Sequence, residues 1–60
     1  MESCTDANGH TWEIYHHTDG WRWRHKASNG LTVGASTQGY SNKSDCIANA
    51  RANGMTCTPR

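Results

Sequence analysis

The sequence predicts a small α+β domain in which an antiparallel sheet is followed by one helix and a short final strand. Residues 12–27 alternate between large apolar and polar side chains, which is the period of a β-strand. Asp19-Gly20 and Asn29-Gly30 supply hairpin turns between strands. After Tyr40 the alternation gives way to a capped helix. The predicted order of elements is therefore β-β-β-α-β.

Length and charge already exclude several classes of protein. The chain has 60 residues, one small domain at most, and a formal net charge of +1. This balance excludes an acidic solvating tail and a strongly basic nucleic-acid arm. Residues 1–10 hold no apolar run for a signal peptide, and no segment is apolar enough to span a membrane. We therefore expect a cytoplasmic protein without a membrane partner.

The three cysteines, Cys4, Cys46 and Cys57, are an odd number without a repeating spacing. Small secreted proteins that depend on disulfides usually have an even and denser set. In a reducing cytoplasm all three thiols would be free. A Cys4–Cys57 bridge between the chain ends stays open as the alternative under oxidising conditions.

The N-terminal residues 1–11 are polar and contain an Asn8-Gly9 turn. They are predicted to form a flexible arm, and residues 12–60 are predicted to form the single domain.

The first hairpin sorts its side chains by chemistry. If Asp19-Gly20 is the two-residue loop of a type I′ turn, Tyr15 lies opposite Arg24 and Glu13 lies opposite Lys26. A slip of one residue would mix the two faces, so the clean separation supports this register. The core face then holds Trp12, Ile14, Trp21, Trp23 and Ala27, and the charged face holds Glu13, Tyr15, His17, Arg22, Arg24 and Lys26.

The second turn gives a less regular result. A type I′ turn at Asn29-Gly30 would place Leu31, Val33 and Ala35 on the charged face, and Thr32, Gly34 and Ser36 on the core face. Two explanations stay open. Either this turn is not a simple two-residue loop, or the charged face is partly covered and its apolar groups pack against arginine stems.

The helix is predicted from Ser41 or Asn42, either of which can cap it, to about Asn53. Its apolar stripe consists of small residues around Cys46 and Ala50, which allow close approach to a sheet rich in tryptophan. The tail has room for one short strand before Pro59, and this strand must pair with a sheet edge because it is too short to be stable alone. Its residues are Met55, Thr56, Cys57 and Thr58.

The chain is poor in the residues that usually fill a core. Its only Leu, Ile and Val residues are Ile14, Leu31, Val33 and Ile47, and it has no Phe. The three Trp and two Tyr residues argue against disorder. Chains of this size usually recruit a disulfide, a metal or a second subunit to complete the fold.

The order of these pieces resembles the YegP-like family of small bacterial and archaeal proteins without an assigned activity. The matching segments are Trp12-Glu13-Ile14-Tyr15, Trp21-Arg22-Trp23-Arg24 with Lys26-Ala27, Ser28-Asn29-Gly30, and Gly39-Tyr40-Ser41 with Lys43. The chain departs from the family at His25, where the family usually has an apolar residue. Its hairpin loop is also one residue shorter.

The resemblance implies a β-β-β-α-β unit that is used in pairs, as a tandem repeat or as a homodimer that exchanges its last strands. This chain holds one copy. We therefore expect a homodimer in which residues 55–58 form the exchanged strand.

Metal and catalytic sites are not favoured by the spacing of the residues. There is no C-x-x-C and no H-x₃-H, and His16 and His17 point to opposite faces of a strand. Cys46 with His25 could form a nucleophile–base pair, but a cysteine on an apolar helix face is more often a small buried hydrophobe. We predict no metal, no cofactor and no enzymatic activity. The residue types that could serve as metal ligands are Cys4, His10, His16, His17, His25, Cys46 and Cys57.

The charged face is the candidate binding surface, through Tyr15, His17, Arg22, Arg24 and Lys26. The first hypothesis is a non-catalytic homodimeric module that binds a protein partner as an adaptor or inhibitor. The alternative is single-stranded nucleic-acid binding through Tyr15, Arg22, Arg24 and Lys26. The alternative is less favoured because the tryptophans lie on the other face, which leaves only Tyr15 to stack on a base.

Overall fold

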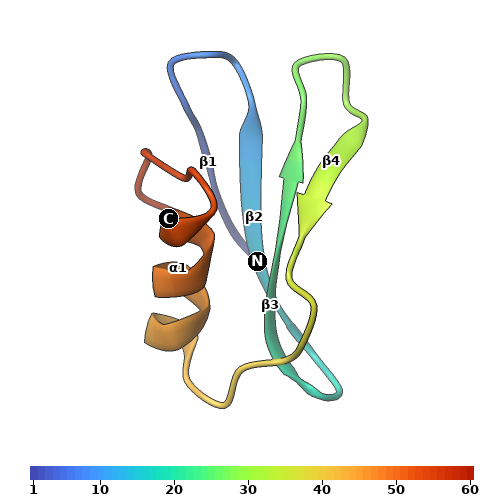
Figure 1. The fold of residues 1–60 in the computed structure, drawn as a ribbon, viewed down its shortest axis with the longest axis vertical. Coiled ribbons are helices and arrows are strands. Elements are labelled where there is room, and N and C mark those ends of the chain that lie inside the picture. Colours follow the sequence, from blue (N-terminus) through green and yellow to red (C-terminus); the bar gives the residue numbers. More distant parts are fainter.

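The computed structural model describes residues 1–60 as a four-stranded antiparallel sheet with one helix against one face (Figure 1). The strands follow one another across the sheet in chain order. The predicted α+β class is confirmed, but the two ends of the chain differ from the predicted β-β-β-α-β order. The elements are β1 (Glu2–Thr5), β2 (Thr11–His17), β3 (Gly20–Lys26), β4 (Thr32–Ala35) and α1 (Lys43–Ala52).

The N-terminal segment that we expected to be a flexible arm contains the edge strand β1. Cys4 lies opposite Trp12, and Glu2 lies opposite Ile14. The turn into β2 is closed by Asp6, whose carboxylate accepts hydrogen bonds from the backbone N–H groups of two residues of the turn. Apolar alternation could not reveal this strand, because Glu-Ser-Cys-Thr offers a single small apolar side chain.

The hairpin between β2 and β3 keeps the predicted faces but not the predicted pairing. Tyr15 lies opposite Arg22, and Glu13 lies opposite Arg24. The loop is therefore Thr18-Asp19, and Gly20 is the first residue of β3 with a φ of 125°. No residue other than glycine has a positive φ, so the turn is not type I′. Because each partner shifts by two residues, every side chain stays on its predicted face.

The turn at Asn29-Gly30 is not a simple two-residue loop, which is the first of the two explanations that the sequence left open. Three residues, Ser28 to Gly30, separate Ala27 from Leu31, and the backbone N–H of Ala27 donates to the Leu31 carbonyl at 2.8 Å. A bulge follows, since His25 pairs with Gly34 while Lys26 pairs with Thr32. This irregular end leaves Leu31 and Val33 exposed, at 65% and 58% of their surface.

The core lies between the sheet and α1. Trp12 and Ile14 come from β2, Trp23 from β3, Cys46 and Ala50 from α1, and Met55 follows the helix. The two buried indoles satisfy their N–H groups, with Trp12 donating to Asp6 Oδ2 at 3.0 Å and Trp23 donating to Asn49 Oδ1 at 2.8 Å. The predicted tryptophan core is confirmed for Trp12 and Trp23.

The hairpin tip and the segment before α1 meet at two glycines. Trp21 and Tyr40 exchange backbone hydrogen bonds of 2.7 and 2.8 Å. A Cβ on Gly39 would lie 2.1 Å from the Asp19 carbonyl oxygen, and one on Gly20 would lie 2.6 Å from that of Tyr40. Glycine is therefore required at position 39 of the Gly39-Tyr40-Ser41 segment, because any side chain there would overlap the backbone of Asp19.

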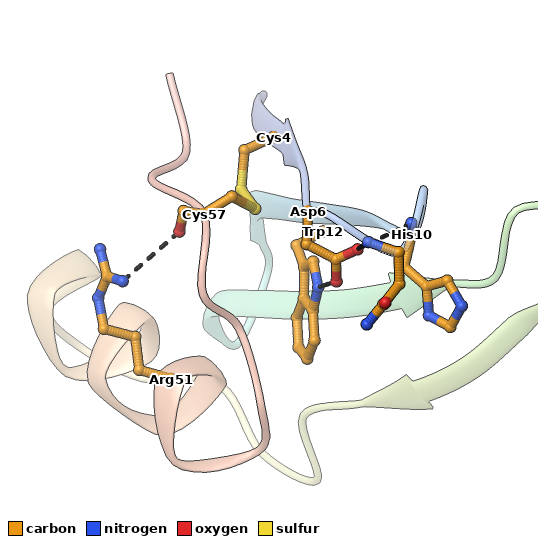
Figure 2. The surroundings of a disulfide bond; sticks show 7 residues. Cys4, Asp6, His10, Trp12, Arg51 and Cys57 are labelled. Atoms are coloured by element: carbon orange, nitrogen blue, oxygen red, sulfur yellow. Dashed lines mark hydrogen bonds between the residues drawn. A yellow bond between two sulfur atoms is a disulfide. The ribbon is translucent and has the colours of Figure 1, made fainter.

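The helix lies where the sequence places it, and no helix of the chain has the length and apolarity that a membrane crossing needs. The predicted final strand is absent, because residues 55–58 pair with no strand in this chain. Met55 instead enters the core, and Cys57 forms a disulfide with Cys4 (Figure 2). Beyond it, Arg60 and Ser3 exchange backbone hydrogen bonds of 3.1 Å.

The disulfide corrects the expectation of three free thiols. Only Cys46 is free, and it is buried in the core. The bridge that stayed open as an alternative supplies part of the stability that the short core lacks. Exchange of residues 55–58 with a second chain stays a prediction.

Candidate functional site

The face of the sheet opposite α1 gathers all of the predicted charged-face residues. The helix covers the tryptophan face, and the other face carries no helix (Figure 1). The sheet register brings Tyr15 beside Arg22 and Glu13 beside Arg24. We call this surface the open face; its members are Glu13, Tyr15, His17, Arg22, Arg24 and Lys26.

Glu13 is the centre of the open face. Its carboxylate accepts a hydrogen bond from Arg24 Nε and lies 3.4 Å from the ammonium of Lys26. Its side chain is only 14% exposed, which strengthens both ion pairs relative to surface pairs. The hydrogen bond from Arg24 is the main cause that lowers the pKa of Glu13 below its ordinary value. Two of the three cations on this face therefore share one carboxylate.

Tyr15 is the only aromatic side chain of the open face, and a cation already lies over it. The Arg24 guanidinium carbon is 4.6 Å from the centroid of the phenol ring. This distance is within the range of a cation–π contact. A nucleobase could stack on that side of the ring only by displacing Arg24 from both the ring and Glu13.

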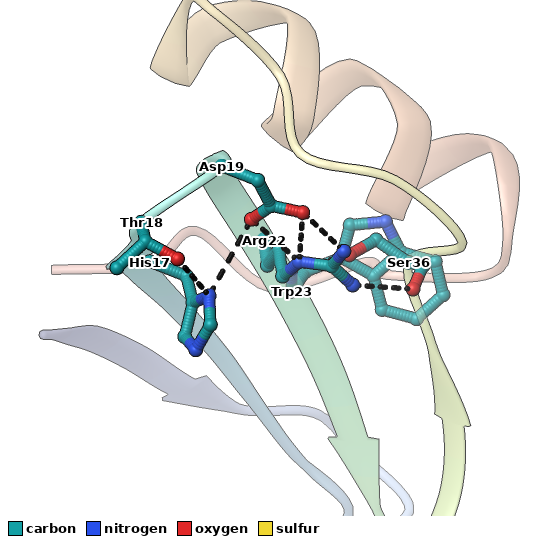
Figure 3. A network of polar contacts seen from close by, with 6 residues as sticks. All are labelled: His17, Thr18, Asp19, Arg22, Trp23 and Ser36. Carbon is teal, nitrogen blue, oxygen red and sulfur yellow. Dashed lines mark hydrogen bonds and ion pairs between the residues drawn. The ribbon is translucent and has the colours of Figure 1, made fainter.

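Arg22 is held at the end of the hairpin by Asp19 (Figure 3). Its Nε donates to both carboxylate oxygens of Asp19, at 3.0 and 3.1 Å. Its Nη1 also donates to the Ser36 carbonyl at 3.5 Å. The hydrogen bonds from Arg22 hold the pKa of Asp19 at about 2 and raise the pKa of Arg22. His17 lies beside this pair, with Nδ1 3.5 Å from Asp19 Oδ1.

The sequence did not show that Asp19 is a partner of Arg22. The sequence predicts only a turn role for Asp19, and it is the observed loop that brings its carboxylate beside the guanidinium. The open face and Asp19 together are consequently almost balanced in charge, with three cations against two carboxylates.

The two edges of the sheet differ beside this face. β4 is the last strand and pairs only with β3, so its outer backbone groups have no strand partner. Leu31 and Val33 are exposed at that edge. On the opposite side, the Ser3–Arg60 hydrogen bonds and the disulfide occupy the edge of β1. We call the outer side of residues 31–35 the β4 edge.

The candidate nucleophile–base pair, Cys46 and His25, lies on the core side of the sheet. No surface pocket is found. No hydrogen bond joins Cys46 to His25, and burial raises the pKa of the Cys46 thiol. His25 instead contacts His10, which sequence spacing did not pair with it. His16 and His17 are exposed.

The comparison with known proteins gives one match. Residues 18–55 match the family model of a domain of unknown function, DUF1508, and this range contains β3, β4 and α1. No curated protein and no solved structure matches the chain. The match covers more than half of the chain and confirms the resemblance to the YegP-like proteins, which are of this kind. The chain therefore belongs to the DUF1508 family of domains of unknown function.

Proposed function

We propose that the chain is a small non-catalytic binding module that acts through a protein partner, as an adaptor or inhibitor. The observation that carries the proposal is the contrast between the open face and the β4 edge. The cations of the open face already have carboxylate partners, whereas the backbone of the β4 edge has no partner strand. An unpaired edge is the surface to which an extended segment of another protein adds as a strand.

The side chains of the β4 edge suit such a partner. Leu31 and Val33 offer apolar contact area beside the unpaired backbone. The bulge between His25 and Lys26 shortens the regular part of the edge, so the partner segment is expected to be short.

A capture experiment with matched variants tests the proposal. The wild type, Leu31→Lys with Val33→Lys, and the helix variant Ala48→Lys are each immobilised and exposed to nuclease-treated cell extract. Ala48 is exposed on α1, away from the β4 edge, so its variant controls for an added surface lysine, one against the two of the β4 variant. We expect the wild type and Ala48→Lys to retain the same protein in a salt-insensitive manner, and the β4 variant to lose it. Equal retention by all three variants would contradict the proposal.

The alternative function is single-stranded nucleic-acid binding through Tyr15, Arg22, Arg24 and Lys26. The excess positive charge of the open face favours it, while the Arg24 guanidinium over Tyr15 opposes base stacking. Fluorescence anisotropy of a labelled oligonucleotide separates the two proposals. Binding that falls steeply with salt and is lost in Arg22→Ser with Arg24→Ser would favour nucleic acid.

We also propose that the module acts as a homodimer by exchanging residues 55–58. In an exchanged dimer Cys57 of one chain would face Cys4 of the other, so oxidation would link the two chains covalently. A dimer band on a non-reducing gel, with a dimeric mass by light scattering, is the expected result. A monomer by both measurements would exclude exchange. The cytoplasmic location stays a prediction, and the disulfide counts against it because disulfides are rare in a reducing compartment.

A further inference from the structure

Three potential metal ligands meet on the tryptophan side of the sheet, away from the open face. Asp6 lies in the turn after β1, His10 directly precedes β2, and His25 lies near the end of β3. One ligand atom from each residue lies within 4.8 Å of the other two. His10 Nδ1 and His25 Nε2 are only 2.7 Å apart. The register that places Trp12 opposite His25 brings this cluster together.

The carboxylate of the cluster is oriented from two sides. Asp6 Oδ1 accepts hydrogen bonds from the backbone N–H of Asn8 at 2.9 Å and of His10 at 3.0 Å. Asp6 Oδ2 accepts the indole N–H of the buried Trp12 at 3.0 Å (Figure 2). A carboxylate oxygen has more than one acceptor position, so these bonds fix the group without using all of its lone pairs.

The same tryptophan orients one of the imidazoles. The ring of His25 stacks on the Trp12 indole with centroids 3.8 Å apart and an angle of 9° between the planes. Trp12 therefore fixes both Asp6, through its N–H, and His25, through its face. Such outer contacts are what hold metal ligands in position in proteins.

We propose that Asp6, His10 and His25 form a binding site for a divalent transition-metal ion of the zinc class. Two imidazole nitrogens and one carboxylate oxygen are a common zinc donor set, with a fourth position left for water. Tetrahedral zinc with bonds of about 2.0–2.1 Å holds two nitrogens roughly 3.3 Å apart. The ion therefore replaces the hydrogen bond between the rings and moves their nitrogens apart by about half an ångström. Spacing rules did not predict the site, because its ligands come from three segments of the chain.

Zinc titration of the tag-free, oxidised chain tests the site. Isothermal calorimetry is expected to give one zinc ion per chain for the wild type. His10→Ala and Asp6→Asn should each lose at least about 10- to 100-fold in affinity, because even the loss of a residue that only orients a metal ligand costs that much and these two residues are ligands themselves. The matched control is His16→Ala with His17→Ala, which removes the other two histidines of the chain and should bind zinc as the wild type does.

A second measurement keeps the test independent of the stability of the variants. In the wild type, zinc should shift the NMR signals of the His10 and His25 rings and leave those of His16 and His17 unchanged. Zinc should also raise the Tm, because it binds only the folded arrangement. Absence of binding at millimolar zinc would overturn the proposal. So would binding that survives His10→Ala and is lost in the His16/His17 control.

Discussion

The two edges of the sheet are completed in opposite ways. At the β1 edge, the C-terminal tail exchanges backbone hydrogen bonds with Ser3, Cys57 is bonded to Cys4, and Lys43 of α1 forms an ion pair of 2.6 Å with Glu2. At the β4 edge, the backbone has no partner, and Leu31 and Val33 face solvent. A chain with so small a core thus secures one edge of its sheet with its own tail and leaves the backbone of the other edge unpaired.

The largest expected effect on stability comes from removing the disulfide at the β1 edge. Cys4→Ser with Cys57→Ser should lower the free energy of unfolding by about 4 kcal/mol, because the bridge closes a loop between residues 53 positions apart. Urea denaturation of the variant and of the reduced wild type measures this loss. Reductant should have no further effect on the double variant. A loss below about 1 kcal/mol would mean that the disulfide at the β1 edge contributes little to the stability of the fold.

The next effect concerns the hairpin tip, where the sheet is joined to the segment before α1. Gly39→Ala should cost about 1–3 kcal/mol, because its Cβ would overlap the Asp19 carbonyl and force the backbone apart. Gly34→Ala is the control, since its Cβ would make ordinary contacts at 3.7 Å. Thermal denaturation should show a clearly lower Tm for Gly39→Ala only. Similar Tm values for the two variants would contradict the close approach of the two segments.

A pH-dependent effect is expected from Asp19, at the end of the open face. The Arg22 guanidinium lowers the pKa of this carboxyl from 3.8 to about 2. The pair therefore contributes stability above the unfolded pKa and loses it as the pH falls through the folded pKa. Between about pH 4 and pH 2, the wild type should lose more stability than Asp19→Asn. Parallel unfolding curves for the two proteins across this range would show that the ion pair adds nothing in solution.

The smallest effect on stability should come from the β4 edge. Leu31→Lys with Val33→Lys should change the free energy of unfolding by no more than about 0.5 kcal/mol per site, because both side chains are exposed. Chemical denaturation at two protein concentrations measures the change. A loss of several kcal/mol, or one that depends on concentration, would show that this edge is buried in an assembly of chains.

The sequence predicted the parts of the fold in which large side chains alternate. Trp12, Ile14 and Trp23 were placed correctly in the core, and the charged residues were placed correctly on the other face. The hairpin pairing was wrong by two residues because Thr18-Asp19 forms the loop, but a shift of two does not change the faces. The prediction of which residues share the charged face was therefore unaffected by the wrong pairing.

The two ends of the chain could not be predicted in this way. β1 has almost no apolar pattern, and it forms because the Asp6 turn returns it to β2 and the tail holds it from outside. Residues 55–58 do have the composition of a strand, but Cys57 is drawn to Cys4, and this contact between distant residues leaves no local signal. The proximity of Asp6, His10 and His25 was hidden for the same reason, since it depends on the exact register of three segments.

The disulfide also determines how the chain carries a mechanical force. A pull applied to the backbone before Cys4 and after Cys57 passes through the covalent bridge before it reaches the sheet. The residues between the two cysteines are shielded from such a pull. With the bond formed, the two bridged positions are expected to keep a nearly fixed separation under load, and reduction is expected to let the same 53-residue span extend.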